Sequence, residues 1–105
     1  MQERWPNFLE HLVTSTGKLT DRTRRAVLER ASGSPETEAG KDIPAPLRDF
    51  ADTVAQRSYR ITEPDIAALH QAGHSDDEIF EAMIVAAAGA ADRHLRAAHR
   101  VWQER

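Results

Sequence analysis

Apolar residues recur along this chain at the three- and four-residue intervals of α-helices, and no segment gives a convincing strand. Pro6 suits the first turn of a helix that Gly17 ends. Thr20 caps a second predicted helix, which the Ser32-Gly33-Ser34-Pro35 turn stops. The segment 33–46 holds three prolines and two glycines, so we expect a loop that contributes little to the core. The apolar faces of the two helices carry Trp5, Phe8, Leu9, Leu12 and Val13, then Ala26, Val27 and Ala31.

Two more helices are predicted between this loop and residue 73. The third helix of the chain ends near Ser58 or Tyr59. The fourth begins at the capping sequence Thr62-Glu63-Pro64-Asp65 and ends at Gly73. Their inward positions are Leu47, Phe50, Ala51 and Val54, then Ile66 and Leu69.

The last predicted helix, 76–104, opens at a second capping box, Ser75-Asp76-Asp77-Glu78. At about 1.5 Å per residue it is roughly 43 Å long, whereas a compact domain of this size has a radius of gyration of about 13 Å. We therefore expect this helix either to bend near Gly89 or to project beyond its domain. Its first half, 79–91, is apolar nearly all round, which predicts burial on every face.

The end of this helix is amphipathic, and in a single subunit it would leave Val101 and Trp102 poorly covered. We therefore predict a homo-oligomer. The small residues of the 86–91 run suit a subunit contact and, equally, a central helix that neighbouring helices approach closely. The predicted interface residues are Ala87, Ala91, Leu95, Ala98, Val101 and Trp102. Together these patterns predict an all-α fold, a single compact bundle of about five helices over residues 1–105 with a long last helix.

Composition excludes several classes of function. The chain has 105 residues, 30% of them charged, and a net charge of −3, so nothing favours nucleic acid as a partner. The longest apolar run, 82–91, is too short to span a bilayer, and the first residues lack the apolar run of a signal peptide. We therefore expect no membrane partner and a cytoplasmic location. Cysteine is absent, which removes disulfides, thiolate metal sites and cysteine nucleophiles.

The segment ITEPDIAALHQAGHSDDEIFEAMIVAAAGAADRHL resembles the second half of proteins in the alkylhydroperoxidase D (AhpD) and carboxymuconolactone decarboxylase superfamily. The likeness covers about residues 44–102, and the predicted helix at 47–51 matches the one that leads into this segment. The resemblance implies an AhpD-like helical domain. The matching positions are Ile61-Thr62, Asp65-Ile66, Leu69, Ala72-Gly73, Ser75-Asp76, Glu78-Ile79 and Asp92-Arg93.

The chain departs from that family where the peroxidase chemistry resides. Members of the peroxidase type carry a CxxC pair with a downstream His, on a helix whose place is taken here by the 33–46 loop. A peroxidatic cycle needs a thiolate nucleophile and a resolving thiol. Because the chain has no cysteine, thiol peroxidase activity is excluded.

Other chemistry must use histidines and carboxylates. His70 and His74 are four residues apart, the spacing of a two-His metal pair, but Gly73 between them favours solvated residues at a helix end. His94, His99 and Asp92 are candidates for proton transfer. The simpler interpretation of Asp92 is an ion pair with Arg96 at i,i+4. No residue pattern predicts a cofactor.

Two functions remain open from the sequence. The favoured one is a non-catalytic, homo-oligomeric AhpD-like module that acts as a structural or partner-binding subunit. The alternative is a small thiol-independent enzyme of the decarboxylase or lyase type, in which His and carboxylates move protons. A cavity enclosed by the oligomer, in which His94 or His99 meets a carboxylate from another helix, would favour the enzyme.

Overall fold

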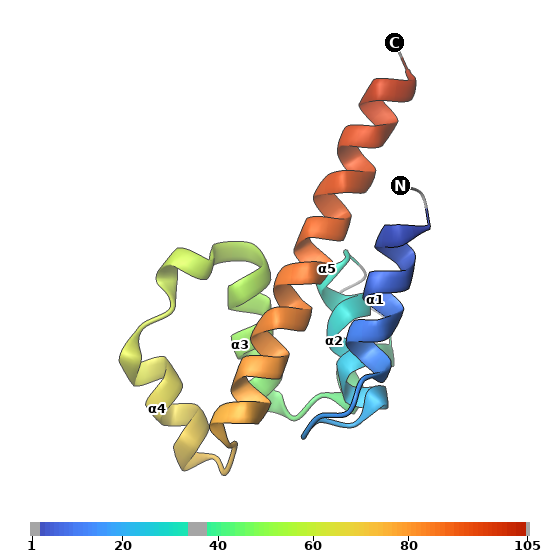
Figure 1. The fold of residues 1–105 in the computed structure, drawn as a ribbon. Helices are drawn as coiled ribbons and strands as arrows, with labels where there is room; N and C mark the ends of the chain where they lie inside the picture. The colour runs from blue at the N-terminus through green and yellow to red at the C-terminus, as the bar shows by residue number, and fades with distance from the viewer. Residues whose placement is uncertain (1–2, 34–37, 105) are drawn as a thin grey trace.

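A computed structural model describes residues 3–33 and 38–104, and all the regular secondary structure in these ranges is helical, without a strand (Figure 1). The predicted all-α fold with about five helices and a long last helix is therefore confirmed. The elements in chain order are α1 Arg4–Thr14, α2 Asp21–Ala31, the 3-10 helix η1 Glu38–Asp42, α3 Ala45–Arg57, the 3-10 helix η2 Ser58–Arg60, α4 Glu63–Gln71 and α5 Asp76–Gln103.

The helix starts follow the capping sequences. Ser75 Oγ accepts from the amide of Glu78 at 3.2 Å, and Glu78 Oε1 accepts from the amide of Ser75 at 2.9 Å. At the start of α4, the amide of Thr62 donates to Asp65 Oδ2 at 2.9 Å. Gly73 has a φ of +97°, a conformation that L side chains rarely adopt, so glycine suits the turn between α4 and α5. Local hydrogen bonding thus determines where the last two helices begin.

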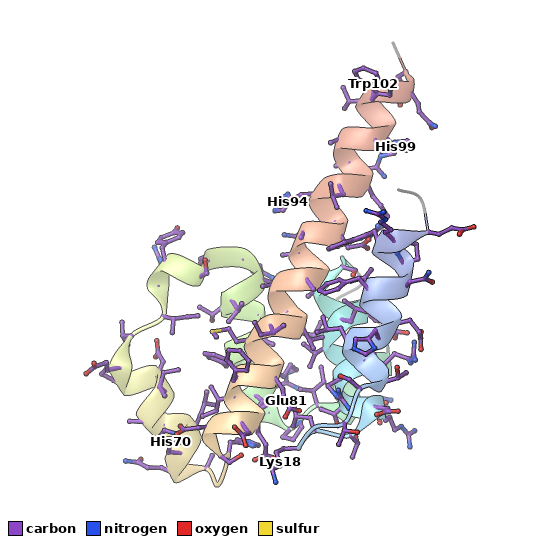
Figure 2. All side chains as sticks on the ribbon, viewed as in Figure 1. Lys18, His70, Glu81, His94, His99 and Trp102 are labelled. Atoms are coloured by element: carbon purple, nitrogen blue, oxygen red, sulfur yellow. The ribbon has the colours of Figure 1, made fainter. Side chains whose placement is uncertain are left out.

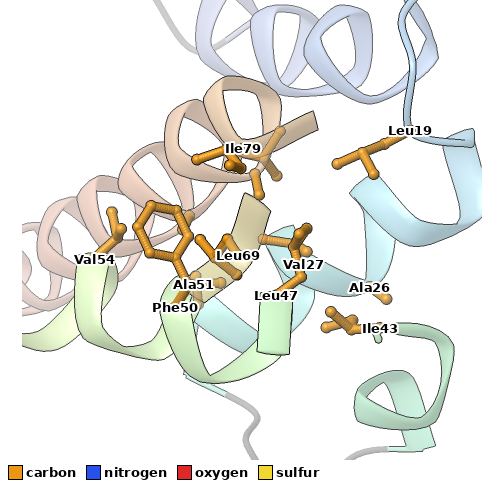
Figure 3. Packing of buried hydrophobic residues seen from close by; sticks show 14 residues of the cluster. Leu19, Ala26, Val27, Ile43, Leu47, Phe50, Ala51, Val54, Leu69 and Ile79 are labelled. Atoms are coloured by element: carbon orange, nitrogen blue, oxygen red, sulfur yellow. The ribbon is translucent and has the colours of Figure 1, made fainter. Parts of the chain in front are cut away.

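The first half of α5 is the centre of the core, and α2 and α3 pack on it (Figures 1 and 3). Ala82 and Val85 are each 1% exposed, and Ala86 is fully buried. α1 and α4 cover the core from the two sides. Besides Val85, the larger side chains of this cluster are Leu19, Val27, Ile43, Leu47, Phe50, Val54, Leu69 and Ile79.

Helix α5 continues through Gly89 without interruption, and its second half extends beyond the rest of the chain (Figure 1). The projection makes the structure elongated, with principal extents of 49 × 29 × 23 Å. A Cβ on Gly89 would lie 2.5 Å from Ala31 Cβ and 2.9 Å from the carbonyl oxygen of Leu28. Glycine here admits the close approach of α2. Of the two predicted alternatives for the long helix, a bend near Gly89 or a projection beyond the domain, the structure shows the projection.

Two sequence-based expectations need correction. The predicted 33–46 loop, of which residues 34–37 lie outside the described residues, contains η1 and a buried residue, Ile43, which is 4% exposed. The segment is held on α2, where Thr23 Oγ1 donates to the carbonyl oxygen of Asp42. Burial of the first half of α5 on every face is also wrong, because Phe80 is 57% and Ile84 is 36% exposed. α2 and α3 cover only part of the circumference of α5.

Candidate interaction surface on the last helix

One face of α5 carries a line of apolar residues that the rest of the described chain leaves largely exposed. Its residues follow one another at steps of four, three, four, four, three and four. Eleven residues make about three helical turns, so this spacing keeps all of them on one side of the helix. We call this line the α5 stripe: Phe80, Ile84, Ala87, Ala91, Leu95, Ala98 and Trp102.

The α5 stripe is exposed along most of its length. Trp102 is 67% exposed and Leu95 49%, and Ala87 and Ala98 are exposed as well. Five of the six predicted interface residues therefore lie on one surface. The sixth, Val101, is 65% exposed but lies about 100° around the helix from Trp102. The stripe also takes in Phe80 and Ile84, which the sequence interpretation placed in the core.

The opposite face of α5 is fixed to the core by arginine as well as by apolar packing. Arg93 donates to the carbonyl oxygens of Ala31 at 3.3 Å and Ala55 at 3.5 Å. Arg96 donates to the carbonyl oxygen of Ser32, the residue that follows α2. These bonds satisfy carbonyls at the ends of α2 and α3. They also fix the rotation of α5, and with it the direction in which the stripe faces.

Asp92 links α1, α5 and the end of α2. Its Oδ1 accepts from the indole Nε1 of Trp5 at 2.9 Å, and its Oδ2 accepts from Arg96 Nε at 3.0 Å. The predicted Asp92–Arg96 pair is therefore confirmed. Trp5 also stacks on Phe8, with ring centroids 5.6 Å apart. Since both Asp92 oxygens accept hydrogen bonds, this carboxylate positions α1 along α5.

Glu81 fixes the other end of α1. Its two oxygens accept the backbone amides of Lys18 at 2.8 Å and Leu19 at 2.9 Å, in the turn between α1 and α2 (Figure 2). In the sequence, Glu81 ends a segment, 61–81, that carries acidic side chains and no Lys or Arg. Nothing in the local pattern signals this contact, because its partners lie more than 60 residues away.

A hollow of about 120 Å³ lies between α1 and α5, beside the start of the stripe. Phe80 and Ile84 form part of its wall. Arg24 also lines it and is 4% exposed, and within the described residues its Nε has no hydrogen-bond partner. We call this space the α1–α5 hollow. Its other lining residues are Leu12, Ser15, Thr16, Glu81 and Val85.

The candidate proton-transfer histidines lie on the projecting half of α5. His94 and His99 are both exposed and leave the helix on different sides (Figure 2). Neither lines the α1–α5 hollow, nor the two hollows of about 370 Å³ beside α3 that Asp65 borders. The arrangement that would favour the enzyme, one of these histidines meeting a carboxylate in a cavity, is not formed within the described part of a single subunit.

His70 and His74 each lie near a different carboxylate. His70 Nε2 forms a hydrogen bond with Asp76 Oδ1, and His74 Nδ1 lies 3.8 Å from Glu78 Oε1. α4 ends at Gln71, so the two histidines do not share one helical face. In the described ranges, 3–33 and 38–104, no group of three or more His, Asp or Glu residues is arranged to hold a metal ion. These contacts connect α4 to the start of α5.

Comparison with protein-family models, curated proteins and solved structures finds no match to this chain. Among the described helices, none combines the length and the apolar character that crossing a bilayer requires. The α5 stripe is therefore the feature from which a function can be argued.

Proposed function

We propose that the protein is a non-catalytic, homo-oligomeric helical module of AhpD-like architecture, and that it acts as a structural or partner-binding subunit. The observation that carries the proposal is the α5 stripe, a row of exposed apolar side chains along a helix that extends past its own domain. Contiguous exposed apolar surface of this kind is typical of protein interfaces.

The composition of the stripe supports this role. Trp and Phe are enriched at protein interfaces and dominate their energetics. Fully burying one large apolar side chain contributes roughly 1.5–3 kcal/mol, and the stripe offers four that are now a third or more exposed: Phe80, Ile84, Leu95 and Trp102. The hydrogen bonds of Asp92 and Glu81 hold α1 against α5, next to the stripe.

The absence of a cysteine nucleophile supports the non-catalytic part of the proposal. The AhpD-like resemblance would bring thiol chemistry, but the chain has no cysteine to perform it. Asp92, the carboxylate that the sequence offered for proton transfer, is engaged in holding helices together. An AhpD-like domain that lacks the CxxC pair can still use its exposed surface, here the α5 stripe, for assembly.

The test is the mass of the protein in solution. Light scattering coupled to size exclusion at micromolar concentration is expected to give an oligomer for the natural chain and a monomer for Leu95→Glu. Gln103→Glu introduces the same charge in the same part of α5 but away from the stripe, and is expected to leave the oligomer intact. Circular dichroism should show the same helix content for all three proteins. A monomeric natural chain, or an unchanged mass for Leu95→Glu, would contradict the proposal.

A further inference from the structure

We infer that two copies of this chain pair antiparallel along the α5 stripe, about a twofold axis at Ala91, and that the α1–α5 hollow of each copy receives the partner's Trp102. This inference rests on the proposed self-assembly and specifies its geometry. The first observation behind it is that the stripe is symmetric about Ala91. Its positions lie four, seven and eleven residues away on both sides: Ala87 and Leu95, Ile84 and Ala98, Phe80 and Trp102.

Such symmetry is what an isologous interface requires. About a twofold axis, if residue i meets residue j of the partner, then j meets i. When the axis passes through Ala91, every stripe residue lies level with a stripe residue of the partner. A stripe with unequal spacing on the two sides would leave apolar residues level with polar ones.

The sizes of the side chains favour the antiparallel direction. Antiparallel pairing places Ile84 level with the partner's Ala98, and Leu95 level with the partner's Ala87. A large side chain thus meets a small one in both layers, as close packing requires. On the axis, where each copy meets itself, the residue is the small Ala91. Parallel pairing would instead put Leu95 against the partner's Leu95 and leave space between the two Ala87 residues.

Charge favours the same direction. Asp76 and Asp77 are exposed in the first turn of α5, which is the positive end of its dipole. Antiparallel pairing opposes the two helix dipoles and keeps the two acidic starts apart. Parallel pairing would bring acidic starts together.

The position of α1 explains the projecting half of α5. Trp5, at the start of α1, bonds Asp92, and the turn that follows α1 bonds Glu81. Helix α1 therefore lies beside only the first part of the stripe. In the antiparallel pair, each α1 lies beside the projecting half of the partner's helix. The partner's Trp102 then lies level with Phe80, at the mouth of the α1–α5 hollow that Phe80 and Ile84 line.

Cysteine cross-linking tests this geometry directly, because the natural chain has no cysteine and each introduced thiol is therefore unique. Ala91→Cys is expected to form a disulfide-linked dimer under mild oxidation. In Ala87→Cys alone, the two thiol positions are separated by about 12 Å along the helices, beyond the roughly 7 Å between Cα atoms that a disulfide tolerates. The same holds for Leu95→Cys alone. A mixture of these two variants should cross-link, since 87 lies level with 95 of the partner.

The outcomes separate this inference from the proposal on which it rests. Ala91→Cys should give about tenfold more linked dimer than Ala87→Cys or Leu95→Cys alone, since only the first meets the distance requirement. Equal cross-linking by all three single variants, or an oligomer mass other than a dimer or a multiple of dimers, overturns the antiparallel pair while self-assembly stands. A natural chain that stays monomeric in light scattering overturns both.

Finally, Trp102→Ala should weaken the dimer at least as much as Phe80→Ala, and an unaltered dimer in Trp102→Ala overturns the occupancy of the hollow.

Discussion

The carboxylate of Glu81 lies so close to Gly17 that a Cβ at that glycine would come within 2.7 Å of Glu81 Oε1. The same carboxylate accepts the amides of Lys18 and Leu19, the two residues that follow. A single side chain of α5 therefore binds the whole turn between α1 and α2. Because α1 forms one wall of the α1–α5 hollow, this contact also shapes the candidate interaction surface.

Removal of the Glu81 carboxylate is expected to destabilise the protein. Hydrogen bonds to charged groups contribute about 1.5–3 kcal/mol, so Glu81→Ala should lower the free energy of unfolding by about 2–3 kcal/mol. Glu81→Gln keeps one acceptor oxygen and should cost less. Urea unfolding at one fixed protein concentration measures both. Glu29→Ala, an exposed change on α2, is the control and should stay within about 0.5 kcal/mol. Equal stability of Glu81→Ala and this control would show that the turn holds its position without the carboxylate.

Gly89 gives a prediction that opposes helix propensity. In an ordinary helix interior, Gly→Ala stabilises by roughly 0.5–1 kcal/mol. Here the added methyl would meet Ala31 Cβ at 2.5 Å and the Leu28 carbonyl oxygen at 2.9 Å. We therefore expect Gly89→Ala to lower the free energy of unfolding by about 1–3 kcal/mol, the usual cost of overpacking.

A double-mutant cycle distinguishes this clash from a general effect on α5. Ala31→Gly removes one of the contacted atoms, so the combined variant should lose less stability than the sum of the two single changes. A Gly89→Ala protein that melts above the natural chain would mean that α2 approaches α5 less closely than described.

The sequence predicted those parts of the fold that local chemistry determines. Ser75 and Glu78 satisfy each other's amides within one turn, and glycine at position 73 readily adopts the positive φ of the preceding turn. The start of α5 was therefore predictable. The Asp92–Arg96 pair was predictable for the same reason, because one helical turn separates its members.

The candidate surface was predicted less completely, because its shape depends on where distant helices pack. The sequence shows that Phe80 and Ile84 are apolar, but only the positions of α2 and α3 determine that they remain exposed. Their regular spacing with Leu95 and Trp102 was a signal available in the sequence. The contacts of Glu81 and of Trp5 with Asp92 had no such signal, since each joins residues more than 60 positions apart.

The Glu10–Arg25 pair between α1 and α2 gives a pH prediction. Arg25 NH1 and NH2 donate to the two oxygens of Glu10, at 3.2 and 2.8 Å. Hydrogen bonding to Arg25, assisted by its charge, holds the pKa of Glu10 below its ordinary value of 4.5, against a smaller opposing effect of desolvation. Because the folded pKa is lowered, the pair stabilises the fold fully above the unfolded pKa. That contribution is lost as the pH falls through the folded pKa.

Nuclear magnetic resonance of the Glu10 side-chain carboxyl measures this titration. The midpoint in the natural chain is expected below 4.5, and Arg25→Gln should raise it toward that value by removing both donors. Arg22→Gln is the matched control, because Arg22 pairs with Asp42 of η1 rather than with Glu10 and should leave the midpoint of Glu10 in place. If Arg25→Gln left that midpoint unmoved, the pair would not persist in solution, and α1 would be held on the bundle by its other contacts, among them those of Trp5, Glu81 and Arg24.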